Sequence, residues 1–297
     1  MKSQVLAGYL LGFLGVVIFS GTVPMTRIAV AFFDPWFVTF GRAALAGLVA
    51  LPILLIARPF LPDRSGPVLL VISLALVIGF PGFAALALLT VPAAHGGVVL
   101  GILPVATAAA AVLLVGERPS PLFWCLTLGG AALVAVFSLR HGDGGFETGD
   151  ILLVLAAVSA AIGYALSGRL SRTAPGWAVI CWALVLALPL TVPASAVLWR
   201  SDYLMAPATA WGAFLYLGLF SMLLGFFAWN AGLAIGGIAH VGQVQLLQVF
   251  VTLAIAAVLL GEKISGEEML FALLVTAVVA LTARARRTAV GNAQPAP

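Results

Sequence analysis

Hydrogen-bonding side chains recur at helical spacing near residue 248, inside a long apolar stretch. At about 100° per residue, Gln245, Gln248 and Thr252 fall within about 60° of arc on one face of a helix. Amide and hydroxyl groups in hydrocarbon need partners, so this stripe either bonds neighbouring helices or lines a wet cavity. Trp229 and Asn230, near the end of the preceding apolar stretch, favour a cavity that binds a small molecule.

A second polar face is predicted around residue 164. Tyr164, Ser167 and Ser171 share one side of a helix at spacing i, i+3 and i+7. Thr22 stands 142 positions before Tyr164, at an offset that recurs in the duplication described below. This face either packs against other helices or lines the same cavity.

His95, His240 and Arg42 are the other candidates for binding. Each histidine opens an apolar stretch, where it is either a hydrogen-bonded interfacial residue close to water or a substrate or gating residue. Arg42 lies near the outer end of its stretch, so we expect its side chain to reach the membrane surface. The alternative is that Arg42, with Gly41, meets a carboxylate substrate at the entrance of the cavity.

The pattern of acidic and thiol residues argues against catalysis. All ten carboxylates fall in the links between apolar stretches or at their edges, and no His-Glu-x-x-His motif occurs. The two cysteines lie in separate apolar stretches. We therefore expect no catalytic residues, no metal site and no cofactor. Because coupled carriers usually keep an ionisable group at membrane depth, the pattern also favours facilitated diffusion or exchange.

Two acids that follow glycines are expected to be structural. Glu117 and Glu262 each come after a glycine that should end one helix, and each should lie near the positive N-terminus of the next. Ser265 and Glu268 have the spacing of a capping box.

The elements that must position these residues are membrane-spanning helices. The 297 residues are 63% hydrophobic and 8% charged, whereas a soluble domain is about a quarter charged. The net charge of +4 comes from single basic residues at the ends of apolar stretches, so we expect no nucleic-acid partner. The expected fold is an all-α polytopic membrane protein with ten transmembrane helices, at 5–31, 36–57, 66–88, 94–115, 119–138, 149–170, 176–198, 209–232, 239–260 and 266–283.

The chain contains an internal duplication. His95-Gly96-Gly97 leads a stretch that ends in Gly116-Glu117, and 145 positions later His240-Val241-Gly242 leads one that ends in Gly261-Glu262. Other residues recur at nearly the same offset. Since each half holds an odd number of helices, the second half must enter the membrane inverted, as in many secondary transporters that work by alternating access.

A glycine-rich link at residues 140–145 separates the halves. We predict a first repeat at 1–145, a second at 146–285, and a disordered cytoplasmic tail at 286–297. With both termini cytoplasmic, nine basic residues lie inside and five outside, which is the orientation that the positive-inside rule favours. The lipid bilayer and a small substrate are the expected partners, and the expected chain is monomeric.

The duplication, with the turns Gly116-Glu117-Arg118 and Gly261-Glu262-Lys263, resembles the drug/metabolite transporter superfamily, in particular its ten-helix branch with two EamA repeats. The resemblance covers the chain to about residue 285. Within that branch, the length and composition are similar to those of YddG-type exporters of aromatic amino acids. The resemblance implies an exporter of the inner (plasma) membrane with a central cavity between the repeats.

These features favour a small-molecule transporter. A carrier of phosphate esters would need several buried Lys or Arg, whereas amides, hydroxyls and aromatic rings suit a net-neutral or zwitterionic metabolite such as an aromatic amino acid. The alternative is a proton-coupled drug or metabolite exporter. An intramembrane enzyme or a membrane protein without transport activity explains fewer of these features.

Overall fold

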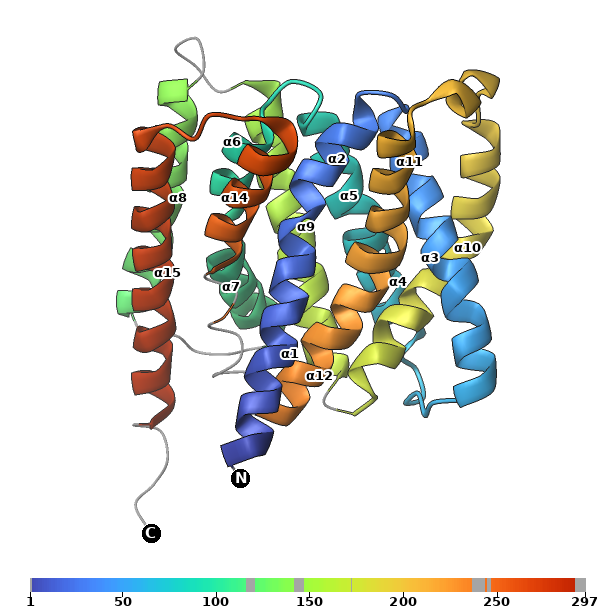
Figure 1. The fold of residues 1–297 in the computed structure, drawn as a ribbon. Helices are drawn as coiled ribbons and strands as arrows, with labels where there is room; N and C mark the ends of the chain where they lie inside the picture. Colours follow the sequence, from blue (N-terminus) through green and yellow to red (C-terminus); the bar gives the residue numbers. More distant parts are fainter. Residues whose placement is uncertain are drawn as a thin grey trace.

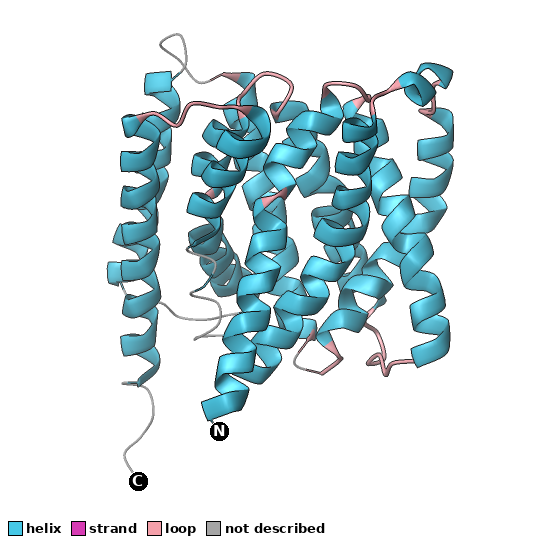
Figure 2. Cartoon of the chain, viewed as in Figure 1, coloured by secondary structure: helices cyan, strands magenta, loops and turns pink. Residues whose placement is uncertain are grey.

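The computed structural model describes residues 2–115, 121–141, 147–171, 173–236, 244 and 247–291. Within these ranges every regular element is a helix, and the loops between them are short (Figure 2). The all-α polytopic fold predicted from the sequence is confirmed.

Ten helical passages run through the described chain, and several consist of two or three consecutive pieces. The first half contains α1 (Lys2–Ser20), α2 (Thr22–Val30), α3 (Pro35–Ala57), α4 (Gly66–Ile72), the π-helix η1 (Ser73–Gly79), α5 (Phe80–Ala87), α6 (Ala93–Leu100), α7 (Leu103–Val115) and α8 (Pro121–His141). The second contains α9 (Thr148–Leu170), α10 (Gly176–Val197), the 3₁₀ segment η2 (Ser201–Met205), α11 (Ala208–Leu215), the π-helix η3 (Tyr216–Leu224), α12 (Gly225–Gly236), α14 (Gln248–Leu260) and α15 (Gly266–Gly291).

The passages stand side by side in one bundle, and the start of α1 and the end of α15 lie at the same face (Figure 1). We call this the terminal face and the opposite one the far face. α8 and α15 form one edge of the bundle, and α3 and α10 form the other (Figure 1). Since the chain starts and finishes at one face, it crosses an even number of times. Six of the described stretches are each long and apolar enough to span a membrane unaided.

Several passages are interrupted midway. Gly21 separates α1 from α2, and Gly101 with Ile102 separates α6 from α7. In the third passage the π-helix η1 ends at Gly79, and α5 follows with Pro81 as its second residue. Proline lacks an N–H and leaves a carbonyl without its helical donor. In the same region Ser159 of α9 donates a hydrogen bond to the carbonyl of Ala75 at 3.0 Å, and this carbonyl also accepts the backbone N–H of Phe80.

Helices of the two halves pack closely through glycines. A Cβ atom added to Gly232 of α12 would lie 2.6 Å from the backbone nitrogen of Gly12 in α1, and one at Gly47 of α3 would lie 3.0 Å from the carbonyl oxygen of Leu184 in α10. Small residues let membrane helices approach until their backbones touch, where dispersion forces hold them. The α1–α12 and α3–α10 pairs therefore join the first half to the second.

Glu262 caps a different helix from the one predicted. Its carboxylate accepts hydrogen bonds from the backbone N–H groups of Ala93 at 2.9 Å and Ala94 at 2.8 Å, at the N-terminus of α6. The negative charge favours that helix end because its unpaired N–H groups carry partial positive charge. The prediction that Glu262 serves the following helix was wrong, because Ser265 and Glu268 already cap α15 with the predicted capping box. Glu117 lies outside the described residues.

Candidate functional site

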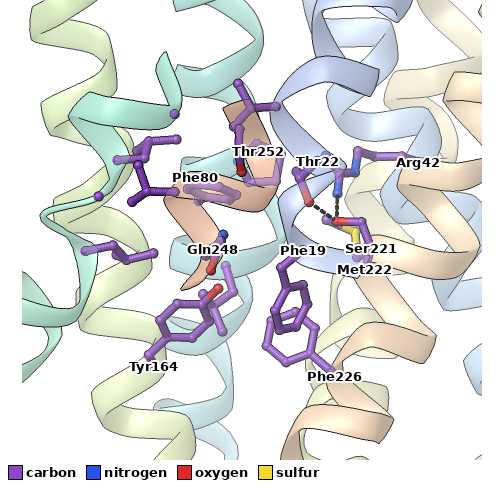
Figure 3. Close-up of a pocket in the computed structure, with 18 of the residues that line it drawn as sticks. Phe19, Thr22, Arg42, Phe80, Tyr164, Ser221, Met222, Phe226, Gln248 and Thr252 are labelled. Atoms are coloured by element: carbon purple, nitrogen blue, oxygen red, sulfur yellow. Dashed lines mark hydrogen bonds between the residues drawn. The ribbon is translucent and has the colours of Figure 1, made fainter. Parts of the chain in front are cut away.

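A cavity lies inside the bundle where several helices are interrupted (Figure 3). Its free volume is about 50 Å³, which is room for a few water molecules. Both halves contribute to its wall: Phe19, Thr22, Val23, Arg42, Leu76, Phe80, Pro81, Gly97, Leu100, Gly101 and Leu103 from the first, and Tyr164, Ile180, Ser221, Met222, Phe226, Gln248, Val249, Thr252 and Thr276 from the second. Broken helices at membrane depth are tolerated where they line such a cavity.

Arg42 is buried in the cavity wall, with 2% of its surface exposed. The expectation that its side chain reaches the membrane surface was wrong. Arg42 is the eighth residue of α3, so it lies about 10 Å along the helix from its first residue. The side chain instead turns into the bundle, where Nη2 donates a hydrogen bond to Oγ of Ser221 at 3.1 Å.

Arg42, Ser221 and Thr22 form what we call the Arg42 cluster. Thr22 Oγ1 lies 2.8 Å from Ser221 Oγ, so the two hydroxyls share a hydrogen bond. The three side chains come from α3, η3 and α2, and the dashed lines of Figure 3 join them in one chain. The Nε atom of Arg42 has no hydrogen-bond partner in the described part of the chain.

The opposite wall of the cavity is aromatic and carries neutral polar groups. Tyr164 and Gln248 lie across from Arg42, and the rings of Phe19 and Phe226 lie between Tyr164 and the Arg42 cluster (Figure 3). The rings of Phe19 and Phe226 meet edge to face with centroids 5.0 Å apart, and this arrangement suits the charge distribution of aromatic rings. Thr252 donates to the carbonyl of Ser20 at 3.1 Å, which anchors α14 beside the break after α1.

Four of the ten residues predicted to bind substrate line this cavity: Thr22, Arg42, Tyr164 and Gln248. The structure brings them together from four helices. Gln245 and His240 lie outside the described residues. The remaining four, Ser167, Trp229, Asn230 and His95, lie elsewhere.

Trp229 and Asn230 make contacts between helices. The backbone and Cβ of Trp229 pack against Gly15 of α1, and its ring meets Phe19 edge to face, with centroids 6.4 Å apart. Asn230 donates a hydrogen bond to the carbonyl of Gly176 at 2.8 Å, at the start of α10. Ser167 is buried on α9 away from the cavity wall. Trp229, Asn230 and Ser167 thus lie outside the cavity wall of this structure, and a role of these residues in substrate binding stays a prediction.

His95 is buried, and the expectation that it lies close to water was wrong. Its Nε2 lies 2.7 Å from Oδ1 of Asp150, which is only 1% exposed. Asp150 also accepts a hydrogen bond from the backbone N–H of Glu147 at 3.2 Å, as part of the capping box of α9. The pair therefore joins the first turn of α6, in the first half, to the first turn of α9, in the second.

The sequence carried weak signals for the residues that were missed. Ser221 is a lone hydroxyl within the apolar run Leu217–Leu224, and a lone polar residue of this kind needs a partner inside the membrane. Asp150 has the N3 spacing of a capping box after Glu147, but this spacing says nothing of its contact with His95, 55 positions away. Phe19 and Phe226 are two of 18 phenylalanines and carry no distinguishing pattern.

Comparison with known proteins places the whole chain in one family. The model of the EamA-like transporter family matches twice, over residues 6–139 and 147–284. The uncharacterized transporter YdeK of Bacillus subtilis (strain 168) is 47% identical over 258 residues, covering 86% of this chain and 90% of that protein. The probable terminal-alkyne amino-acid exporter of Streptantibioticus cattleyicolor is 28% identical over 179 residues, 58% of each protein.

A solved crystal structure supports the same fold. It superposes with a TM-score of 0.65 at 21% identity, and the match covers 95% of this chain and 98% of that one. At this level of identity the likeness shows the fold alone.

Proposed function

This chain belongs to the EamA-like transporter family, and we propose that it exports amino acids, with aromatic side chains favoured, through the cavity between its two repeats. It is a multi-pass membrane transporter. The observation that carries the proposal is the composition of the cavity. Among the described residues, Arg42 is the one cation of the wall, aromatic rings line the cavity beside and across from it, and both halves of the bundle contribute.

Amino acids fit the distribution of groups around the cavity. Arg42 offers positive charge to a carboxylate, Tyr164 and Gln248 offer oxygen atoms to an ammonium group, and Phe19 and Phe226 offer an apolar surface to a side chain. The similarity to a protein named as a probable amino-acid exporter supports the same class. We place the chain in the plasma membrane with both termini in the cytoplasm, because nine of the 14 basic residues would then lie inside.

Alternating access accounts for the size of the cavity. About 50 Å³ of free space does not hold an amino acid, so the helices must separate before one enters. Four of the passages that line the cavity are interrupted, at Gly21, at Gly101 and at the two π-helices, and interruptions of this kind let the halves of a helix move separately. The inverted repeats supply two equivalent ways to open, one toward each face.

Facilitated diffusion or exchange is the coupling mode that the cavity favours. Within the described chain, no carboxylate or histidine lines the cavity, and these are the groups that coupled carriers usually keep there to exchange a proton against the substrate. A proton-coupled exporter is the second candidate. It is favoured by the buried contact between His95 and Asp150, two ionisable residues that lie away from the cavity wall.

Counterflow in proteoliposomes tests the proposal. Purified protein should exchange labelled phenylalanine for internal phenylalanine without any pH or sodium gradient. Replacement of Met222 by Trp should abolish this exchange, because Met222 lines the cavity, is 3% exposed and leaves no space for a larger ring. The matched variant Met205→Trp should transport normally, since Met205 is 87% exposed on the far face.

Three results would count against the proposal. If the wild-type protein does not exchange amino acids, the proposed substrate class is wrong. If both tryptophan variants transport equally, the cavity does not lie on the transport pathway. Exchange that collapses when an imposed proton gradient is dissipated would favour the proton-coupled alternative, and His95 and Asp150 would then be the first residues to replace.

A further inference from the structure

The cavity contains a cation, Arg42, that no acid of the described residues neutralises. Arg42 takes part in none of the ion pairs of the described residues, and the cavity wall that they form includes no aspartate or glutamate. Arginine remains charged in proteins, and a buried charge without a partner is costly. An ionisable residue that is kept at membrane depth under these conditions marks a ligand site.

The Arg42 cluster is also short of hydrogen-bond acceptors. A guanidinium carries five N–H donors, and Arg42 makes one hydrogen bond to the described residues, from Nη2 to Ser221. The hydroxyls of Ser221 and Thr22 share one bond, so one O–H hydrogen remains available whichever of them donates. The cluster therefore presents several donors to the cavity, and a group with two acceptor oxygens would satisfy them.

We propose that the Arg42 cluster binds the carboxylate of the transported molecule, and that this carboxylate, rather than an ammonium group, decides which molecules are recognised. The inference rests on the proposed function and concerns the same cavity. A carboxylate can accept two parallel hydrogen bonds from a guanidinium, and such charge-assisted pairs are the strongest in proteins. An amine without a carboxylate would meet repulsion from Arg42 and no counter-ion on the described wall.

The ammonium group of an amino acid then has a secondary role. The groups that can accept from it, the side-chain carbonyl of Gln248 and the hydroxyl of Tyr164, are neutral, and they lie across the cavity from Arg42 (Figure 3). Hydrogen bonds between neutral and charged groups are weaker than a paired carboxylate and guanidinium. A carboxylate that lacks the ammonium should therefore still bind.

The cluster also places the carboxylate between the two halves. Arg42 and Thr22 belong to the first half, whereas Ser221 lies on π-helix η3 of the second. A bound carboxylate would touch donors on both sides of the interface that must rearrange during transport.

Three analogues of one compound separate the two charged groups. Purified wild-type protein is melted with phenylalanine, with 3-phenylpropionate, which lacks the ammonium, and with 2-phenylethylamine, which lacks the carboxylate. A ligand that binds the folded state raises the melting temperature. We expect a rise with the first two compounds and none with the amine, and the same order in competition against phenylalanine transport.

Variants then assign the effect to Arg42. Arg42→Gln should weaken the apparent affinity for 3-phenylpropionate by about 10- to 100-fold, the loss expected for a hydrogen bond to a charged group, and should relieve the exclusion of 2-phenylethylamine. Arg42→Lys, which keeps the charge but loses the planar fork, should fall between Arg42→Gln and the wild type. Arg58→Gln is the matched control, because Arg58 is exposed at the other end of the same helix and should leave all three affinities unchanged.

The comparison of analogues needs no variant, so it decides the inference even if Arg42→Gln does not fold. Binding of the amine but not of 3-phenylpropionate to the wild-type protein would overturn it. An unchanged affinity in a folded Arg42→Gln variant would overturn it as well. Neither result depends on transport. If the carboxylates bind and no exchange follows in proteoliposomes, then the proposed export fails while the carboxylate site stands.

Discussion

At the scale of single residues, the buried polar groups of this bundle differ in whether they have partners. Thr26 donates a hydrogen bond to the carbonyl of Thr22 at 2.7 Å, and Ser20 donates to the carbonyl of Val16 at the same distance. Thr191 on α10 is 0% exposed, and its hydroxyl has no partner among the described residues. A buried hydroxyl without a partner reduces stability, because it has given up its hydrogen bonds to water.

This difference predicts opposite effects for two matched substitutions. Thr191→Val removes an unpaired hydroxyl at nearly constant volume, so it should stabilise the protein by about 1 kcal/mol. Thr26→Val removes a paired hydroxyl and should destabilise it by a similar amount, about 1 kcal/mol. The melting temperatures of the two variants in detergent measure both effects on stability. A lower melting temperature for Thr191→Val would show that its hydroxyl has a bonding role.

Arg42 shows what residue-level reasoning from the sequence could and could not reach. Its identity suggested a carboxylate site, but its place near one end of an apolar stretch suggested contact with water. Its depth could have been derived, because seven residues of helix are about 10 Å. Its partner Ser221 could not, since the two residues lie 179 positions apart and meet only through packing of the halves.

At the scale of helices, the far face is where elements of the second half hold α6. Asp150 of α9 pairs with His95, and Glu262, in the loop after α14, caps Ala93 and Ala94. Two carboxylates thus bind the first turn of one helix. α6 also carries Gly97 and Leu100 into the cavity wall, so these contacts position part of the candidate site.

We predict that the contact between α6 and α9 contributes to stability. Asp150→Asn replaces a charged acceptor beside buried His95 with a neutral one, and should cost about 1.5 kcal/mol. Asp34→Asn is the matched control at the N-terminus of α3. Asp34 accepts from the N–H groups of Trp36 and Phe37, and asparagine caps helices as well as aspartate does. The measurement is the melting temperature of each variant. If both substitutions lower it equally, the contact of Asp150 with His95 makes no special contribution to stability.

The helices themselves were largely predictable, whereas their interruptions were only partly so. Apolar stretches bounded by Pro, Gly and charged residues located the ten passages to within a few residues at most ends. In the third passage Pro81, a residue type that interrupts helices, follows the irregular segment Ser73–Gly79. The π-helix Tyr216–Leu224 contains no proline, and its irregular backbone arises from packing that the local sequence does not encode. The same limit applies to Trp229, because the residue that it contacts, Gly15, is 214 positions away in the sequence.

At the scale of the whole molecule, the duplication provides two similar halves with unequal chemistry. Arg42 aligns with Ala183 at the offset of 141 residues that relates Trp36 to Trp177, so within the described residues the positive charge of the cavity wall comes from the first half. Ser221 and most of the neutral polar groups come from the other. Substrate binding therefore depends on both halves together, and opening depends on how they move apart.

Alternating access through this cavity is the central claim, and the accessibility of one cavity position to both faces tests it most directly. Met222→Cys is made in a Cys125→Ala background, because Cys125 is exposed and Cys181 is buried. Membrane vesicles of both orientations are then treated with an impermeant thiol reagent. The account predicts labelling from either face and slower labelling from both when phenylalanine is present. Labelling from one face only, or labelling that phenylalanine leaves unchanged, would contradict it.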